Sequence, residues 1–393
     1  MAPHTRWGIR QTLLLLQCCL GSIVHAQGLL GSNPALPQIH AGALAWADYD
    51  SDGDGDLLMA GEDSAGVAVV QLLRNDGPNF VPMPVPFSPM PAAACAWGDS
   101  DGDGDPDLLL TGRKRGKGRT EHWVNNGPAG FALHSPGLPG VQHGAVAYGD
   151  LDGDGDLDAI IAGANYDRGY ISLVLENNGG VLREAGTGIE GFCTAQLATA
   201  DLDGDSLPEV ILCGRVQGGE PAFAAYHNLG GFQFTQLSGN VPAMPEGSLS
   251  LADFDLDGDP DLLASGASRP YGLGIWTTDG GTFSGTANLG LPGIALGDAQ
   301  CLDFNGDGLQ DFVYCGTEVG GGAVARAMRQ LPGGGFSDHQ PSHPLAGLHL
   351  CRIAVADWNG DGHPDFALSG VDGAGLGVAV LYRWDVPAGR FVR

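Results

Sequence analysis

The chain has 393 residues, with 46 acidic and 18 basic side chains and a formal net charge of -28. This excess of negative charge argues against nucleic acid and anionic membranes as partners. Glycine is abundant, at 66 residues, yet 43% of the residues are hydrophobic, which excludes a disordered polyelectrolyte and predicts a folded, turn-rich protein.

The N-terminal segment has the pattern of a secretory signal. Arg6 and Arg10 precede the apolar run "TLLLLQCCLGSIV", and the small residues of "VHA" end at Ala26. The run is too short to span a bilayer, and no later segment is long and apolar enough to be a transmembrane segment. We therefore expect a signal peptide over residues 1–26 and an exported mature protein, secreted or periplasmic, over residues 27–393.

An acidic nine-residue motif recurs seven times in the mature chain. Its copies, such as "DLDGDGDLD", begin at residues 48, 99, 150, 201, 253, 303 and 357. In every copy a glycine follows the first aspartate by 13 residues. The units, of about 51 residues each, fill the chain and leave no room for a second domain.

Within each unit the periodicity is that of strands. A segment of mostly small residues with an alternating pattern, such as "GAVAYG", precedes the motif. A short apolar run such as "DLLLTG" follows it, and two further segments are separated by glycine-bearing turns. This predicts an all-β fold, a seven-bladed β-propeller of four-stranded antiparallel blades with a calcium loop in each blade. A linear solenoid is the alternative, but equal units without capping repeats favour a ring. We expect residues 28–37 to close it by pairing with the last segment, "GRFVR".

The motif itself predicts a calcium site in each unit. Side chains at positions 1, 3, 5 and 9 supply oxygen ligands, position 7 can add a backbone carbonyl, and glycine at position 6 allows a sharp turn. The predicted ligands are Asp48, Asp50, Asp52 and Asp56; Asp99, Asp101, Asp103 and Asp107; Asp150, Asp152, Asp154 and Asp158; Asp201, Asp203, Asp205 and Glu209; Asp253, Asp255, Asp257 and Asp261; Asp303, Asn305, Asp307 and Asp311; and Asp357, Asn359, Asp361 and Asp365. Up to one Ca²⁺ per blade is expected, coupled to folding because the carboxylates would otherwise repel one another.

The seven copies of the motif are not equal. The copy at 201 has Ser206 and Glu209 where the others have glycine and aspartate, so it should be the weakest, and the copies with Asn305 and Asn359 should be intermediate. An EF-hand or a dockerin would place a helix after the loop, whereas here strands flank it. A merely solvated acidic turn is the plainest alternative, and sevenfold repetition of the spacing argues against it.

The loops, the strand after each, and the trailing turns "NDGPNF", "NNGPAGF" and "NLGGF" resemble the FG-GAP/VCBS repeats of integrin α-subunit propellers and many exported bacterial proteins. The resemblance covers almost the whole mature chain. It implies a propeller that binds Ca²⁺ through the matching positions. It implies little about function, because this scaffold serves adhesion, carbohydrate binding and, in some polysaccharide lyases, catalysis.

The connections between the second and third strands of four units are rich in basic and aromatic residues. Since strands alternate in direction, these connections lie on the face opposite the loops. The candidate ligand-binding residues there are Arg113, Lys114, Arg115, Lys117, Arg119, Tyr166, Arg168, Tyr170, Arg215, Arg269 and Tyr271. Such an arc could dock an anionic polysaccharide or a protein. Solvated hairpin tips are the plainer interpretation and the one favoured.

No catalytic constellation stands out in the sequence. There is no HExxH, GxSxG or zinc-spaced cysteine pattern, so no catalytic residue is assigned. The favoured function is a non-catalytic, calcium-binding module, a monomer, for extracellular carbohydrate or protein ligands. A carbohydrate-active enzyme resembling a polysaccharide lyase and a structural envelope protein are the alternatives.

Overall fold

The computed structural model describes residues 36–393, apart from 78, 187, 240, 268–271, 290 and 340–343, and these residues form seven four-stranded antiparallel sheets. The predicted seven-bladed propeller is therefore confirmed. The predicted signal peptide, residues 1–26, lies outside the described residues. The described part of the chain has no helix that is long and apolar enough to cross a bilayer.

Each sheet is one blade, numbered here in chain order. Blade 1 contains β1 (Ile39–Ala47), β2 (Asp56–Asp63), β3 (Ala68–Asn75) and β4 (Phe80–Met83); blade 2 contains β5 (Ala94–Gly98), β6 (Asp107–Lys114), β7 (Lys117–Asn125), a short 3-10 turn η1 (Gly127–Ala129) and β8 (Phe131–His134). Blade 3 contains β9 (Gln142–Gly149), β10 (Asp158–Asn165), β11 (Gly169–Asn177) and β12 (Leu182–Ala185); blade 4 contains β13 (Phe192–Ala200), β14 (Glu209–Val216), β15 (Pro221–Asn228) and β16 (Phe234–Gln236). Blade 5 contains β17 (Ser248–Ala252), β18 (Asp261–Gly266), β19 (Gly272–Asp279) and β20 (Thr282–Asn288); blade 6 contains β21 (Ile294–Leu302), β22 (Asp311–Glu318), β23 (Ala323–Gln330) and β24 (Phe336–Asp338); blade 7 contains β25 (His349–Ala356), β26 (Asp365–Val371), β27 (Gly377–Asp385) and β28 (Arg390–Val392).

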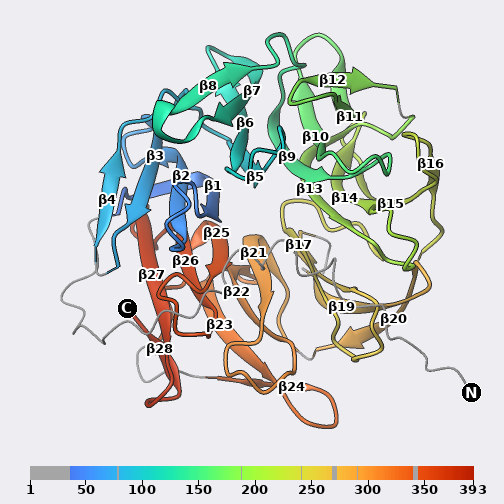
Figure 1. Ribbon diagram of the computed structural model, residues 1–393. Helices are drawn as coiled ribbons and strands as arrows, with labels where there is room; N and C mark the ends of the chain where they lie inside the picture. The colour runs from blue at the N-terminus through green and yellow to red at the C-terminus, as the bar shows by residue number, and fades with distance from the viewer. Residues whose placement is uncertain are drawn as a thin grey trace, which may run out of the picture.

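The blades are arranged in a ring with their first strands toward the centre and their fourth strands outside (Figure 1). Blade 7 lies beside blade 1, and direct contacts join them. Trp46 Nε1 donates to the carbonyl of Ala354 at 3.0 Å, and Gln38 Oε1 accepts the Ala379 N–H at 3.0 Å. Most of the segment expected to close the ring, residues 28–37, lies outside the described residues. The last segment forms the outer strand β28, paired with β27.

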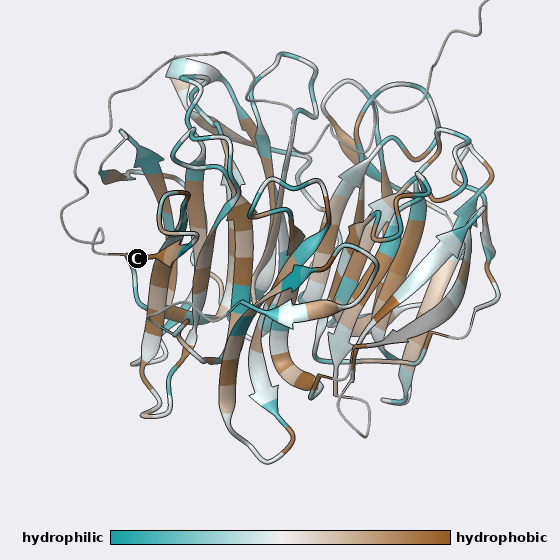
Figure 2. Ribbon diagram, turned by 90° about the horizontal axis from the view of Figure 1, so that it is seen from below, coloured by the Kyte–Doolittle hydropathy of each residue, from teal (hydrophilic) through white to brown (hydrophobic). Residues whose placement is uncertain are grey.

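The hydrophobic core is divided among the interfaces between neighbouring blades. The second strand of each blade is buried on both sides, because each side faces another blade. In β2, Leu57 and Met59 pack against blade 7, whereas Leu58 and Ala60 pack against blade 2. This explains the continuous apolar runs after each motif; burial of one such leucine contributes about 1.5–3 kcal/mol. Figure 2 shows hydrophobic segments along the strands and hydrophilic ones in many of the loops.

The nine-residue motifs all connect the first strand of a blade to its second strand. They are called loops 1 to 7 here, numbered by blade. Position 9 of each loop is the first residue of the second strand, as in the pairing of Ala47 with Asp56. Because the strands are antiparallel, the loops share one face of the ring with the turns between third and fourth strands. The connections between second and third strands lie on the opposite face.

Candidate metal sites

Each loop folds around the carboxylate at its own position 1. In loop 3, Asp150 Oδ1 accepts the N–H of Asp154 at 3.1 Å, and Oδ2 accepts that of Gly155 at 3.0 Å. Position 6 has a positive φ in all seven loops, at Gly53, Gly104, Gly155, Ser206, Gly258, Gly308 and Gly362. The predicted sharp turn at position 6 is therefore present, and glycine suits it because it has no Cβ.

The loops bring several of the predicted ligands together. Ligand atoms of positions 1, 3 and 9 lie within 4.8 Å of one another in loops 1, 2 and 3, and so do those of positions 1, 3 and 5 in loop 4; the residues are Asp48, Asp50 and Asp56; Asp99, Asp101 and Asp107; Asp150, Asp152 and Asp158; and Asp201, Asp203 and Asp205. In loops 1 to 3 this donor set contains only oxygen, which suits a hard divalent cation such as Ca²⁺.

Loops 6 and 7 have asparagine at position 3, and its amide is turned toward position 9. Asn305 Nδ2 donates to Asp311 Oδ2 at 2.8 Å, and Asn359 Nδ2 donates to Asp365 Oδ2 at 2.9 Å. In addition, Arg329 Nη2 lies 2.8 Å from Asp307 Oδ2 at position 5 of loop 6. Both loops therefore have a hydrogen-bond donor at the carboxylate of position 9, and loop 6 also has a cation paired with position 5.

The carboxylate at position 9 is the deepest group of each site. All seven side chains at this position are at most 1% exposed, namely Asp56, Asp107, Asp158, Glu209, Asp261, Asp311 and Asp365. In loop 3, Asp158 Oδ2 accepts the N–H of Leu151 at 3.0 Å, and Oδ1 accepts that of Asn177 at 2.8 Å. These bonds to backbone N–H groups hold the carboxylate in a fixed orientation.

Burial is the main cause of a raised pKa at position 9. Burial, with a smaller contribution from neighbouring loop carboxylates, raises the pKa of Asp158 and of Asp311 to about 7 and that of Asp365 to about 9. A carboxylate that is costly to ionise in the folded protein is one that a bound cation would stabilise.

These raised pKa values predict that calcium-free protein becomes more stable as the pH is lowered from 8 to 5. The unfolded carboxyls titrate near about 4, so between that pH and 7 the folded state binds more protons than the unfolded state. This stabilisation is complete below the unfolded pKa and is lost as the pH rises through the folded pKa. Thermal melts in metal-free buffer at pH 5 and pH 8 measure it. An unfolding temperature at pH 5 equal to or below that at pH 8 would contradict the expectation.

A buried amide at the end of the third strand links neighbouring loops. Its side chain donates to the carbonyl of position 2 in the loop of the preceding blade: Asn75 to Trp358 at 2.7 Å, Asn125 to Tyr49 at 2.7 Å, Asn177 to Ser100 at 2.6 Å, Asn228 to Leu151 at 3.0 Å and Gln330 to Phe254 at 2.8 Å. The backbone N–H of each of these bridging residues donates to position 9 of its own loop. Each loop is thus completed by the next blade.

Blades 5 and 7 make this connection differently. Thr278 replaces the amide in blade 5, and the N–H of Gly281 donates to Leu202 O of loop 4 at 3.0 Å. Trp384 replaces it in blade 7, where its ring lies 4.8 Å from that of Phe304 in loop 6. In the sequence the trailing turns were recognisable only as a family feature, and these links between blades were not predicted.

Replacing a bridging residue should weaken the whole ring. Asn177→Ala removes the bond to Ser100 O and leaves that buried carbonyl without this donor, so we expect a loss of about 1–3 kcal/mol in the free energy of unfolding. Urea denaturation in calcium-containing buffer measures it. Asn178→Ala, at the exposed neighbouring residue, is the matched control. Equal denaturation midpoints for the two variants would show that the bridge contributes nothing.

On the opposite face, most cations of the predicted arc are paired with carboxylates. Arg113 lies 3.5 Å from Glu62, Arg168 lies 2.7 Å from Glu184, and Arg215 lies 3.0 Å from Glu246. Lys114 and Arg119 both approach Glu121, a side chain that is 2% exposed. Lys117 Nζ lies 4.3 Å above the ring of Tyr166, which is 66% exposed. Arg269 and Tyr271 lie outside the described residues.

One contact of serine, histidine and aspartate occurs in blade 2, but it is buried. Ser100 Oγ donates to Asp107 Oδ2, and His122 Nε2 lies 2.9 Å from Ser100 Oγ. All three residues are at most 3% exposed, and burial lowers the pKa of His122 to about 4. The serine proton is directed to the aspartate rather than to the histidine, and no substrate could reach it. The network is structural.

Sequence comparison identifies the repeat. A family model described as an FG-GAP-like repeat matches residues 48–110, 99–161, 150–212, 201–264 and 303–368, which together contain all seven loops and more than half of the chain. No curated protein matches the chain.

Several solved structures are similar to the chain at low sequence identity. A lectin of Agrocybe aegerita, described as recognising non-reducing terminal N-acetylglucosamine, is 20% identical with a TM-score of 0.52, covering 77% of this chain and 79% of its own. A puromycin hydrolase is 14% identical with a TM-score of 0.50, and the match covers 89% of this chain but 52% of the hydrolase. An exotype rhamnogalacturonan lyase is 14% identical with a TM-score of 0.42, covering 92% of this chain and 84% of its own.

Proposed function

The chain belongs to the FG-GAP-like repeat family, and from that premise we propose that it is an exported, calcium-binding propeller that binds carbohydrate or protein ligands without catalysing a reaction. Export rests on the signal-like pattern of residues 1–26. The observation that carries the proposal is the set of seven loops, each with a buried acidic residue at position 9. In loops 1 to 3 that residue lies together with the carboxylate oxygens of positions 1 and 3.

Calcium is the ion that best fits the oxygen-only loops. Their predicted ligands are carboxylates and a backbone carbonyl at position 7, whereas Mg²⁺ demands tighter octahedral geometry. Because six of the loops are hydrogen-bonded to the next blade in the described residues, an ion in one of these loops would stabilise a blade interface as well as a hairpin. Calcium would thereby make the ring a rigid support for binding surfaces.

The ligand-binding role is assigned to the face opposite the loops. Arg115 projects from the tip of the β6–β7 connection, and Lys117 and Tyr166 stack together nearby. Cations and an exposed aromatic ring suit an anionic saccharide, whose carboxylates or sulfates pair with the cations while the sugar stacks on the ring. The lectin with the same fold is consistent with carbohydrate binding by a propeller, and the buried state of the Ser100–His122 network favours binding over catalysis.

The test asks whether immobilised polysaccharide retains the protein or is cleaved by it. Calcium-loaded protein is applied to immobilised acidic and neutral polysaccharides, and the soluble fraction is analysed for unsaturated and reducing ends. We expect retention without cleavage, and about tenfold weaker retention for the combined Arg115→Ala, Lys117→Ala and Tyr166→Ala variant. Val319→Ala, at the exposed connection of blade 6, is the control. Release of new ends would instead favour the carbohydrate-active enzyme, and unchanged retention of the combined variant would exclude this surface.

A further inference from the structure

Loop 4 differs from the other loops in what faces it from the third strand. In each blade, one residue of the third strand donates its backbone N–H to position 9 of the loop. The residue immediately before it is Arg74, Val124, Glu176, His227, Thr277, Arg329 and Arg383 in blades 1 to 7. Blade 4 alone has an imidazole there. The same blade alone has glutamate at position 9 and serine at position 6. Three departures from the repeat therefore coincide in one blade.

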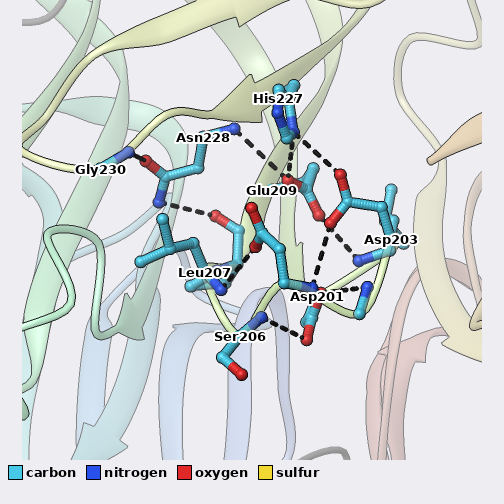
Figure 3. Close-up of polar contacts among 12 residues, drawn as sticks. Asp201, Asp203, Ser206, Leu207, Glu209, His227, Asn228 and Gly230 are labelled. Atoms are coloured by element: carbon cyan, nitrogen blue, oxygen red, sulfur yellow. Dashed lines mark hydrogen bonds and ion pairs between the residues drawn. The ribbon is translucent and has the colours of Figure 1, made fainter. Parts of the chain in front are cut away.

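Two of these residues, His227 and Glu209, lie in direct contact. His227 Nδ1 lies 3.0 Å from Glu209 Oε1 and 3.2 Å from Asp203 Oδ2, so that the imidazole points into the loop (Figure 3). Glu209 Oε2 keeps the bond to the Leu202 N–H, at 2.7 Å, that aspartate makes at this position in loop 3. The backbone is thus held in the usual way, while the longer side chain presents its other oxygen to His227.

The rest of the loop keeps the frame of a metal site. Ser206 has a φ of 78°, close to the value of the glycines at this position, and its N–H donates to Asp201 Oδ2 at 2.9 Å. Glu209 is fully buried, whereas the side chains of Asp203 and His227 are 22% and 27% exposed. The three donor groups therefore converge on a point that solvent can reach from the loop side.

The donor set selects a different class of ion. Oxygen-only sites suit Ca²⁺, whereas imidazole together with carboxylates suits divalent transition metals. The spacing permits coordination of one ion: the ligand atoms of His227, Glu209 and Asp203 lie within 4.8 Å of one another, and tetrahedral ligands about 2.1 Å from Zn²⁺ lie about 3.4 Å apart. The choice of ion therefore rests on the imidazole in the donor set and not on the distances.

We propose that loop 4 binds one divalent transition-metal ion of the Zn²⁺ type through His227 Nδ1, Glu209 and Asp203, in place of the Ca²⁺ proposed for the other loops. The site rests on residues of blade 4 alone. It adds a second kind of metal to the proposed function and does not depend on the polysaccharide-binding surface.

The test uses the full chain, stripped of metal and then saturated with Ca²⁺ so that oxygen-only loops are occupied. Zn²⁺ is titrated by calorimetry, and Co²⁺ by its visible absorption. We expect one equivalent of each to bind with calcium in excess, and His227→Ala to weaken that binding by about 100-fold. Thr277→Ala, at the same strand position in blade 5, is the matched control and should leave it unchanged.

Further variants keep the test decisive. His227→Gln retains a hydrogen-bonding side chain, so loss of Zn²⁺ binding with an unchanged melting temperature in calcium would identify lost ligation rather than lost folding. Glu209→Asp should shift preference toward Ca²⁺. Two results would overturn the proposal: Zn²⁺ binding that is unchanged by His227→Ala, and no Zn²⁺ binding to the calcium-saturated parent protein. Either result would mean that His227 only pairs with the carboxylates. If the other loops did not bind Ca²⁺, the proposed function would be refuted. The Zn²⁺ titration would still show whether loop 4 binds a transition metal.

Discussion

Stripping calcium from the protein is expected to lower its unfolding temperature by at least about 20 °C. At free calcium a hundredfold above the dissociation constant, each site contributes about 2.7 kcal/mol. Six such sites together, about 16 kcal/mol, exceed the whole stability of an ordinary domain, about 5–15 kcal/mol. Differential scanning calorimetry with and without a chelator measures the change.

The structural reason lies in the charge of the loops. In loop 3, Asp150, Asp152 and Asp158 place carboxylate oxygens within 4.8 Å of one another, and Asp158 is 1% exposed. Ion removal leaves this charge uncompensated and strains the hydrogen-bonded links to the next blade. Return of Ca²⁺ should restore the transition, whereas equimolar Mg²⁺ should restore less of it. Superimposable melts with and without chelator would refute calcium as a structural element.

A single substitution at position 3 should change the stability of the protein in opposite directions with and without calcium. Asp152→Asn removes one charge and supplies an amide that can donate to Asp158, as Asn305 does to Asp311 at 2.8 Å. In calcium-free protein at pH 8 we expect a gain of about 1.5 kcal/mol in the free energy of unfolding, because a hydrogen bond to a carboxylate replaces repulsion. With calcium the same variant should be less stable than the parent, because loop 3 loses a charged ligand and binds the ion about tenfold more weakly.

The reverse substitution is the control for this prediction. Asn305→Asp in loop 6 should destabilise calcium-free protein and strengthen its calcium binding. Urea denaturation of the parent and of both variants, each with calcium and with chelator, measures the change in the free energy of unfolding for each variant in each condition. The same sign in both conditions for Asp152→Asn would mean that position 3 does not face a cation.

Much of the fold could be predicted because the spacing and the apolar pattern of the repeat are visible in the sequence. The motif spacing indicated seven units, and the apolar run after each, such as "DLLMAG", predicted a strand that the structure buries on both faces. The role of position 6 followed from glycine chemistry and holds even where Ser206 occupies it. The predicted ligands at positions 1, 3 and 9 indeed converge in loops 1 to 3.

Contacts between distant residues could not be predicted in the same way. The bond from Asn177 to Ser100 spans 77 residues and depends on how two blades are placed. His227 was passed over because it belongs to no histidine cluster in the sequence; the pairing of β14 with β15 brings it to Glu209. The arc was predicted from its basic and aromatic side chains, without the carboxylates that pair with the cations; partners such as Glu121 come from neighbouring strand positions.

The order in which the loops are completed has a consequence for biosynthesis. Loops 1 to 5 receive a hydrogen-bond donor from the blade that follows, so each of these hairpins stays incomplete until the third strand of the next unit has emerged. Loop 7 receives its donor from the first blade, where Asn75 donates to Trp358, 283 residues away in sequence. The site in loop 7 can therefore be completed only once blade 1 and blade 7 have come together. Binding of an ion there would report that the newly made ring has closed.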